Sequence, residues 1–368
     1  MVSIEVNPLA AEFHIGLIES NTPETSSASE TVRYQRAMER ILARAAADTT
    51  QALQLRGHRG RAVVVKNSVD SGGRTHGSHE NYSIRNPLTE SRRRLLRAVH
   101  LAGTLLLWPL WVVSFAVGLI RFAVEVVIGA VLRRISDRTG SDLFGRFLNW
   151  TVWERAWMFG IELPLNVPHI LWAWAMYLLA MRGTIANLTA HLVTRGIWTG
   201  SGWVGPDPGR ADGFRILQKA HSLGRVARLI WINPRRKPIF DGKEFYYKPS
   251  HIFGKTLRLH VIIGENNMSQ HAEWLKLATT SLVVEMIEAG FTDGIPRLAK
   301  PVEAFRRISL DLSLAEKHAA EIVAPVRVPL AATALELQEM IRAAAEEYCR
   351  TLPDGGGEDR RRILAEWK

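Results

Sequence analysis

The pattern of apolar and polar residues along the chain predicts a mixture of helices and strands. Residues 29–56 carry apolar side chains at helical spacing, with Ser29 in the N-cap position, which predicts an amphipathic surface helix. The β-branched run "RAVVVKN" at 61–67 is typical of a buried strand. After a turn, "SHENYSI" at 78–84 predicts the next strand.

The second half of the chain continues this mixture. The segment "LRLHVIIGENNMS" at 257–269 predicts a strand ending in a polar turn, and the apolar positions after it predict a long buried helix. The glycine-rich segment "GIWTGSGWVGPDPGRADG" lacks the Gly-Lys-Ser/Thr ending of a P-loop, so a structural turn is the better interpretation. The tail is helical in pattern, and we expect its end, "DGGGEDRRRILAEWK", to be frayed.

Two uncharged runs stand apart from the rest of the chain. Residues 98–120 contain no formal charge, and a helix of that length covers about 35 Å, enough for a hydrocarbon core of roughly 30 Å. Residues 163–181 are also uncharged and carry aromatic side chains suited to a membrane interface. Between these runs, apolar residues and arginines at helical spacing are typical of an interfacial helix. We therefore expect residues 98–183 to insert into or dock on a membrane, rather than to form a buried hairpin of a soluble protein. The aromatic residues meant here are Trp172, Trp174 and Tyr177.

Charge and cysteine content sharpen this picture. The formal net charge is +11, which fits nucleic acid, an acidic partner or a membrane protein with basic flanks. Four arginines stand directly before the first apolar run, which favours the membrane flank over nucleic acid. The single cysteine, Cys349, excludes an intrachain disulfide and a cysteine-based zinc cluster, and it favours a reducing, cytoplasmic setting. The first twenty residues lack the pattern of a secretory signal. The four arginines are Arg92, Arg93, Arg94 and Arg97.

Acidic and histidine side chains are concentrated at a few places that can carry chemistry. Glu19 lies in an early acidic segment, Glu80 stands beside His79 and Asn81, and His260 lies in a strand. Because strand side chains alternate between faces, Glu80 and His260 can each project from a sheet into one cavity. Carboxylates and a histidine that converge from strands suit divalent ions bridging nucleotide phosphates. Each residue alone is more often structural, so both interpretations stay open.

Several segments together resemble the family of the Pup ligase and the deamidase of Pup, which is related to glutamine synthetase and similar carboxylate–amine ligases. The matches run in family order over residues 17–97 and 190–350. They include "IESNTPETSSASETVRYQRAMERIL", "KNSVDSGGRTHGSHENYSI", "TGSGWVG", "FRILQKAHSL", "LRLHVIIGENNMSQ", "WLKLATTSLVVEMIEAG" and "ATALELQE". The strings "SVDSGG", "GSHENY", "TGSG" and "LHVIIG" look closer to the deamidase branch than to the ligase branch.

The resemblance implies an α+β fold in which a cradle of antiparallel strands packs on helices and holds ATP with Mg²⁺. Glu19 and Glu80 would then be metal-binding carboxylates, and His260 would contact metal or phosphate. For the two arginines among the implied nucleotide or substrate contacts, a solvated surface charge is the competing interpretation. Those contacts are Asn67, Asp70, Asn81, Arg235 and Arg258.

The chain departs from the family pattern at three places. The family opens with a glycine- and glutamate-rich strand that supplies metal ligands, and Glu5 is the nearest substitute here. The position of the family's catalytic aspartate falls on Phe13, and its neighbour Glu12 would point to the opposite face of a strand. The chain also stops soon after "ATALELQE", so we expect a C-terminal part that is truncated relative to the family.

These observations predict four parts of the chain. Residues 1–97 and 184–300 would form the two halves of a catalytic domain, residues 98–183 an inserted hydrophobic segment, and residues 301–368 a helical C-terminal part. Because both flanks of the insertion belong to one ATP-dependent fold, both must lie in the cytoplasm, and any membrane crossings must be even in number.

The leading functional hypothesis is a membrane-attached enzyme of the deamidase type. It would hydrolyse a side-chain amide or isopeptide bond of a Pup-like modifier, and its partners would be that modifier and membrane lipid, not nucleic acid. The first alternative is an inactive pseudoenzyme that binds a modifier or another partner at the membrane. The second alternative is an ATP-dependent carboxylate–amine ligase.

Overall fold

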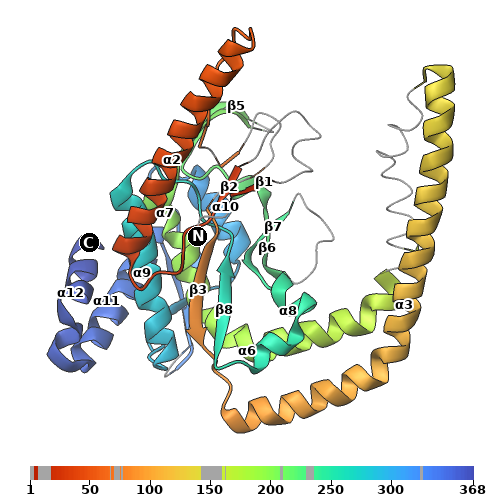
Figure 1. The fold of residues 1–368 in the computed structure, drawn as a ribbon. Helices are drawn as coiled ribbons and strands as arrows, with labels where there is room; N and C mark the ends of the chain where they lie inside the picture. The colour runs from red at the N-terminus through yellow and green to blue at the C-terminus, as the bar shows by residue number, and fades with distance from the viewer. Residues whose placement is uncertain are drawn as a thin grey trace.

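The fold combines helices with small sheets (Figure 1), so the expected α+β class is confirmed. The computed structural model describes residues 4–6, 18–66, 68–69, 75, 78–141, 160–161, 163–207, 210–228, 236–323 and 326–368. The strands described are β1 (Ile4–Val6), β2 (Ile18–Ser20), β3 (Glu80–Arg85), β4 (Trp203–Asp207), β5 (Arg210–Arg215), β6 (Leu223–Arg228), β7 (Lys237–Asp241), β8 (Thr256–Val261), β9 (Pro296–Leu298), β10 (His318–Ile322) and β11 (Val328–Ala332). The α-helices described are α2 (Ala28–Leu55), α3 (Glu90–Thr139), α6 (Leu163–Thr194), α7 (Gly196–Thr199), α8 (Lys243–Tyr247), α9 (Gln270–Glu288), α10 (Pro301–Leu310), α11 (Ala334–Thr351) and α12 (Gly357–Glu366), and the short 3₁₀ turns are η2 (Ala220–Ser222), η3 (Pro249–Phe253) and η4 (Pro353–Gly356).

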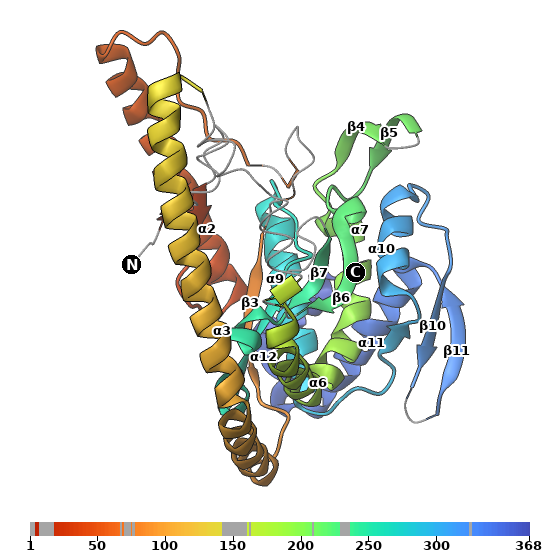
Figure 2. The same cartoon turned by 90° about the vertical axis from the view of Figure 1, so that its right-hand side faces the viewer.

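The central sheet has the strand order β3-β8-β7-β6. β8 runs antiparallel to both β3 and β7, whereas β6 and β7 run parallel. The expected antiparallel cradle is therefore present with one parallel pair. Smaller antiparallel groups are formed by β1 with β2, by β4 with β5, and by β9, β10 and β11. The glycine-rich segment enters the β4–β5 hairpin (Figure 2), in line with its interpretation as a structural turn.

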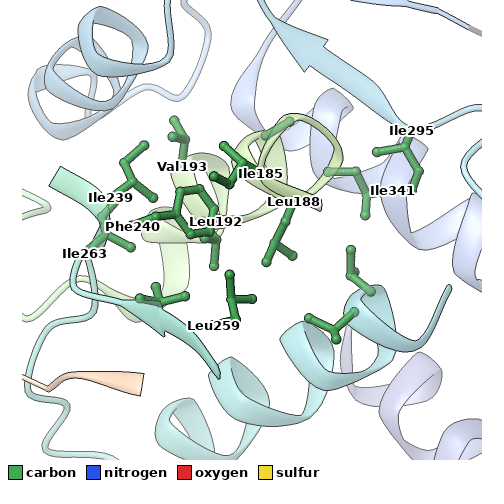
Figure 3. Close-up of a cluster of buried hydrophobic side chains, with 14 of the residues drawn as sticks. Ile185, Leu188, Leu192, Val193, Ile239, Phe240, Leu259, Ile263, Ile295 and Ile341 are labelled. Atoms are coloured by element: carbon green, nitrogen blue, oxygen red, sulfur yellow. The ribbon is translucent and has the colours of Figure 1, made fainter. Parts of the chain in front are cut away.

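The core lies between the central sheet and the helices packed on it. Figure 3 shows the side chains of Ile185, Leu188 and Leu192 from α6 directed at apolar residues of the sheet strands, including Phe240 and Leu259. All five are buried, and each such side chain contributes about 1.5–3 kcal/mol by leaving water. The C-terminal half of α6 is therefore the central helix of the fold.

This place of α6 corrects one expectation from the sequence. Ala173, Met176 and Tyr177 lie in the core cluster, and the Tyr177 ring packs against Phe245 with 5.2 Å between centroids. The interpretation of the second uncharged run as membrane-facing is therefore wrong from Ala173 onward, and Tyr177 is no interface aromatic. Hydropathy records that a helix avoids water, but it cannot distinguish lipid from a protein core. The boundary expected at residue 183 falls inside this continuous helix.

The helix α3 has the opposite environment. It begins at a Thr89 cap, whose side chain accepts from the Arg92 N–H, and continues for 50 residues to Gly140, which ends it in a left-handed conformation. Figure 1 shows that α3 bends and that its second half stands apart from the body of the fold. Gly129 is its one buried residue among the described ones. In the part of the chain that the structure describes, α3 is also the one helix long and apolar enough to cross a membrane.

A short polar seam joins α3 to the beginning of α6. Trp172 donates from Nε1 to Nδ1 of His100 at 2.8 Å, and Asn166 donates to the Ser114 hydroxyl at 3.3 Å. These contacts place residues 163–172 along the first half of α3. The two apolar segments therefore form one unit at the side of the molecule.

The helix expected over 29–56 and the strand expected at 61–67 have different outcomes. The helix expected over 29–56 is present as α2, although Ser27 rather than Ser29 is its N-cap. The buried strand expected at 61–67 is wrong for residues 61–66, which form no strand, and Val63 and Val65 are exposed. A β-branched run becomes a strand only where a neighbouring strand pairs with it, and no described strand does so here.

The last residues of the chain are ordered by their contacts, so the frayed tail that we expected is wrong. Trp367 is buried, donates from Nε1 to the Gln338 side chain at 3.1 Å, and lies edge-on to His191. Arg360 holds Glu285 of α9 through two hydrogen bonds of 3.1 and 2.6 Å. A tryptophan at the end of a charged helix thus anchors α12 on the core.

Candidate functional site

The antiparallel pair β3 and β8 provides the frame of the candidate site. Its register pairs Glu80 with Val261 and Asn81 with His260. Directly opposed residues of an antiparallel pair share a face, and neighbours along a strand alternate. Glu80 and His260 therefore project to opposite faces of the sheet, and the expectation that both enter one cavity is wrong.

The carboxylate of Glu80 lies on the core face and is fully enclosed by donors. Arg195, directly after α6, donates to both of its oxygens at 2.9 and 2.5 Å, and the Tyr82 hydroxyl donates at 2.6 Å. Burial alone raises the pKa of Glu80, but the charges of Arg195 and Lys276 outweigh burial and hold this pKa below its usual value. Glu80 is thus an ionised, saturated carboxylate at neutral pH.

Arg195 connects this pair to a larger set of buried charges. Its Nη1 also donates to the hydroxyl of Thr280 and, at 3.2 Å, to the carbonyl oxygen of Lys276. The Lys276 ammonium pairs with Glu273 at 2.8 Å. All of these side chains are buried, so they fix α9 and the end of α6 against β3.

Lys219 is a further buried cation near this set. Its Nζ donates to the carbonyl oxygens of Ile262 and Gly264, and its backbone N–H donates to Glu265 at 2.7 Å. Burial lowers the pKa of Lys219 to about 7, and the charge of Glu265 limits this decrease. This buried set therefore contains three acids and three bases, and a pKa of about 7 leaves Lys219 only partly charged at neutral pH. The acids are Glu80, Glu265 and Glu273, and the bases are Arg195, Lys219 and Lys276.

Two histidines lie near the other face of β3 and β8. The rings of His79 and His260 meet edge to face with 5.2 Å between centroids. Burial lowers the pKa of His260 to about 4 and that of His79 to about 3, so both rings are neutral at pH 7. Nε2 of His260 is buried and has no hydrogen-bond partner within the described structure. A neutral ring with an open nitrogen can bind a ligand or accept a hydrogen bond.

Arg258 and Asn81 form the exposed part of the same face. Arg258 donates from Nε to the Asn81 side chain at 2.8 Å, and its Nη1 lies 3.3 Å from Glu244. His251 also hydrogen-bonds Glu244, at 2.6 Å. Arg258 is thus oriented by two partners while its side chain stays half exposed. This geometry suits a guanidinium that receives an anionic group from solution.

An open groove of about 1370 Å³ adjoins this face. It runs past the start of α2, the edge of β3, the turn η3 and the helices α9 and α12. Asn81, Arg258 and Glu244 line it together with His79 and Glu80, whereas His260 does not. The groove is wide enough for a peptide segment and brings exposed polar groups together with the β3 edge.

Five of the residues named from the sequence cannot be placed in the fold. Phe13, Glu12, Asn67, Asp70 and Arg235 lie outside the described residues.

For the other two acids, the backbone is described. β1 and β2 pair antiparallel, and the backbone register places Glu5 opposite Glu19. Their metal-binding role stays a prediction.

The described residues do not fit a metal ion at Glu80. Glu80 already accepts three hydrogen bonds, and His260 lies on the opposite face. A divalent ion at Glu80 would also be repelled by the charges of Arg195 and Lys276, which already act on this carboxylate. No group of three or more metal-binding side chains occurs among the residues described.

Sequence reasoning missed Arg195, which determines the environment of Glu80. It follows the apolar stretch "NLTAHLVT" and precedes Gly196. A charged residue directly after a long, mostly uncharged helix is the signal that could have found it, because such a charge must meet a partner where it is buried. The identity of that partner, 115 positions away, is not written in the local pattern.

Comparison with known proteins agrees with this architecture. The model of the Pup-ligase protein family matches residues 13–368. The chain is 39% identical over 137 residues to the Pup deamidase/depupylase of Mycolicibacterium smegmatis, which covers 35% of this chain and 25% of that protein. It is 27% identical over 335 residues to the Pup–protein ligase of Mycolicibacterium vanbaalenii, which covers 90% of this chain and 51% of that protein. The chain thus spans about half the length of the ligase, and its match to the depupylase covers a quarter of that protein.

Solved structures support the fold itself. The Pup ligase PafA in complex with ADP aligns with a TM-score of 0.58 at 20% identity, over 95% of this chain and 55% of that one. PafA in complex with Pup aligns with a TM-score of 0.61 at 19% identity, over all of this chain and 53% of that one. At these identities, the likeness shows a shared fold.

Proposed function

The chain belongs to the Pup-ligase protein family, and from this premise we propose that it hydrolyses a side-chain amide or isopeptide bond of a Pup-like modifier. The observation that favours hydrolysis is the higher identity to the depupylase, 39% over 137 residues, than to the ligase, 27% over 335 residues. In this reaction water supplies a hydroxyl to the carbonyl carbon, and the nitrogen leaves as ammonia or as a lysine amine.

The described groove supports a role in holding the modifier. Arg258 presents a half-exposed guanidinium, and the edge strand β3 borders the groove beside it. We assign to Arg258 the binding of a carboxylate of the modifier, because a guanidinium binds a carboxylate through paired hydrogen bonds. Asn81 holds the Nε side of Arg258 and would position it.

ATP and Mg²⁺ stay proposed cofactors, and no catalytic step is assigned to them. The resemblance and the fold shared with PafA favour a nucleotide site, whereas the saturated Glu80 argues against a metal at that position. Titration calorimetry of the purified chain with ATP, with and without Mg²⁺, separates nucleotide binding from metal binding.

The activity test uses two soluble peptides that share the C-terminal sequence of a Pup-like modifier. One ends in glutamine, and the other is linked through its last glutamate to a lysine. Hydrolysis converts the first to glutamate, which raises its mass by about 1 Da, and frees lysine from the second. Arg258→Lys keeps the charge but loses the paired geometry, so we expect a higher KM for it with little change in kcat.

The same assay distinguishes the alternatives. If the glutamate-ended peptide and an added amine become joined in the presence of ATP, the chain is a ligase and the proposal is wrong. A pseudoenzyme is favoured by one specific observation, namely that the aspartate position of the family falls on Phe13. It would bind the peptides without turning either of them over.

We also propose that the chain is attached to a membrane through α3, with its body in the cytoplasm. The length of α3, its apolar composition and its exposure support this attachment. Fractionation of cells that express the full chain tests it. Recovery in the soluble fraction would remove the membrane from the proposal and leave the hydrolase untouched.

A further inference from the structure

We propose that α3 lies within one leaflet of a membrane with anionic headgroups and does not cross it. This inference rests on the membrane attachment in the proposed function, but not on the proposed reaction. It decides between the spanning and the interfacial arrangement, which the sequence pattern left open.

The first step concerns which solvent α3 meets. Leu105, Leu106, Trp108 and Leu110 are all exposed, with exposed fractions of 69, 80, 62 and 37%. At about 100° per residue these four positions span an arc of about 200° around the helix, which is wider than a single stripe. A protein partner covers one stripe of a helix, whereas lipid covers every side. The exposure of α3 therefore fits lipid and not a docked protein.

The second step uses the common core on both sides of the apolar unit. Ile84 of β3, shortly before α3, and Ala173 of α6 belong to the same buried cluster. Both must therefore lie on one side of any membrane. If α3 crossed the bilayer, the chain would have to cross back before Ala173.

No segment before Ala173 is suited to that return. A helical crossing takes about 20 predominantly apolar residues. Residues 142–155 contain four formal charges, and residues 156–172 contain a fifth, Glu162, together with two prolines, an asparagine and a histidine. The longest uncharged stretch between α3 and the core, residues 163–172, covers about 15 Å as a helix, which is half of the hydrocarbon core. The number of membrane crossings must be even, and α3 is the one candidate span among the described helices. We therefore infer that α3 makes no crossing.

The third step is the fit to a single leaflet. A helix with its side chains is about 10–12 Å thick, and one leaflet contributes roughly 15 Å of hydrocarbon. Along its axis, which bends between the two halves (Figure 1), α3 is about 75 Å long, far more than the bilayer thickness. A helix that lies in the plane of the membrane is thin enough for one leaflet, and the bilayer thickness does not limit its length.

The polar groups on α3 agree with this arrangement. Ser114 and His100 face the seam with α6, and Arg121 is paired with Glu125 at 2.7 Å on the partly covered side. These groups are kept from hydrocarbon by neighbouring protein or by each other.

Charge at the two ends identifies the headgroups. Arginines are concentrated in the first two turns of α3 and again in its last two turns. A helix that crosses carries its basic residues mainly at the cytoplasmic end, whereas an in-plane helix has both ends at the same headgroup layer. Basic side chains near a surface favour anionic lipid by about 1 kcal/mol each. The arginines are Arg92, Arg93, Arg94, Arg97, Arg133, Arg134 and Arg138.

A topology experiment tests the absence of crossing. In a Cys349→Ser background, single cysteines replace Thr139 at the far end of α3 or Lys255 on the body. Intact spheroplasts and lysed cells are then treated with a membrane-impermeant maleimide. We expect both cysteines to react only after lysis. Labelling of the position 139 cysteine alone in intact spheroplasts would overturn the inference.

A flotation experiment tests the lipid. The purified full chain is mixed with preformed vesicles of phosphatidylcholine, alone or with phosphatidylglycerol. We expect flotation mainly with the second kind, and a decrease in partitioning of about tenfold or more for Arg92→Gln/Arg94→Gln. Arg59→Gln/Arg61→Gln removes the same charge from an exposed stretch beyond α2 and should float like the original chain.

Three results would overturn the lipid assignment. They are equal flotation with both vesicle types, an equal loss in the control variant, and no flotation with either vesicle type. Since none of these measurements uses the modifier peptides, failure of the hydrolase proposal would leave them unaffected.

Discussion

Single residues determine how the centre of the fold tolerates charge. The Glu80 carboxylate and the Arg195 guanidinium are both about 99% removed from solvent at their side chains. Removing one partner of such a pair leaves the other buried and uncompensated, which costs about 3–5 kcal/mol, whereas replacing both partners is often close to neutral.

We therefore predict that Glu80→Ala lowers the free energy of unfolding by about 3–5 kcal/mol. The double variant Glu80→Gln/Arg195→Met should be closer to the original chain than Glu80→Ala is. Urea denaturation measures both. Glu303→Ala breaks an exposed pair with Lys300 of 3.3 Å and should cost less than about 1 kcal/mol. If Glu80→Ala also cost less than about 1 kcal/mol, the pair of Glu80 and Arg195 would not be desolvated as described. Because Glu80→Ala destabilises the fold, a loss of ligand binding in this variant would not by itself identify Glu80 as a metal ligand.

Acid should also destabilise the fold through the buried histidines. The pKa of His260 is about 4 in the fold and about 6.5 in the unfolded chain, so the unfolded chain binds protons that the folded chain does not. This contribution to stability is complete above pH 6.5 and is lost as the pH falls towards 4. At pH 5 the loss is on the order of 2 kcal/mol. We expect His260→Gln to lose less stability than the original chain between pH 7 and pH 5 in urea titrations.

The sequence identified Glu80 as a special position but not its role. Alternation along β3 correctly indicated that one face is buried, yet the register with β8 decides which residue of β8 shares that face. A shift of one residue would have put Glu80 and His260 together. Register depends on pairing between segments about 180 residues apart, and local patterns do not contain it.

At the scale of elements, α12 illustrates a contact that composition conceals. Its sequence is rich in charge, which predicted fraying, but Trp367 at its end fills a site between α6 and α11. Arg362 stacks over the Trp274 ring at 4.7 Å and adds a second anchor on α9.

We predict that Trp367→Ala lowers the free energy of unfolding by about 3–5 kcal/mol, as expected for a buried aromatic side chain. Thermal or urea denaturation checks this value. Lys368→Ala changes the exposed neighbour and serves as the control. If both variants had the same stability, the anchoring role of Trp367 would be wrong.

Periodicity predicted the long elements well and the short apolar runs poorly. α2 and α9 follow helical spacing and have side-chain N-caps, so local rules suffice for them. The run at 61–66 has strand composition without a described strand partner, and the run at 163–181 has membrane composition but enters the protein core from Ala173. In both cases the tertiary environment overrides the local preference.

At the scale of the whole molecule, two helices of similar apolar composition meet different surroundings. α6 supplies the core, while α3 is exposed along almost its full length. Stability and membrane attachment should therefore be separable properties of one chain.

We predict that glutamine at four exposed positions of α3 changes the free energy of unfolding by no more than about 0.5 kcal/mol per site, since surface substitutions rarely exceed this value and glutamine is a good helix former. The same variant should lose its association with vesicles, because the apolar surface that lipid covers is interrupted. Met176→Gln in α6 is the matched contrast: it buries an amide in the core and should cost several kcal/mol without affecting any lipid contact. Urea denaturation and vesicle flotation on the same preparations measure both properties. A large loss of stability in the α3 variant would mean that α3 is covered by protein rather than lipid. The four positions are Leu105, Leu106, Phe115 and Phe122.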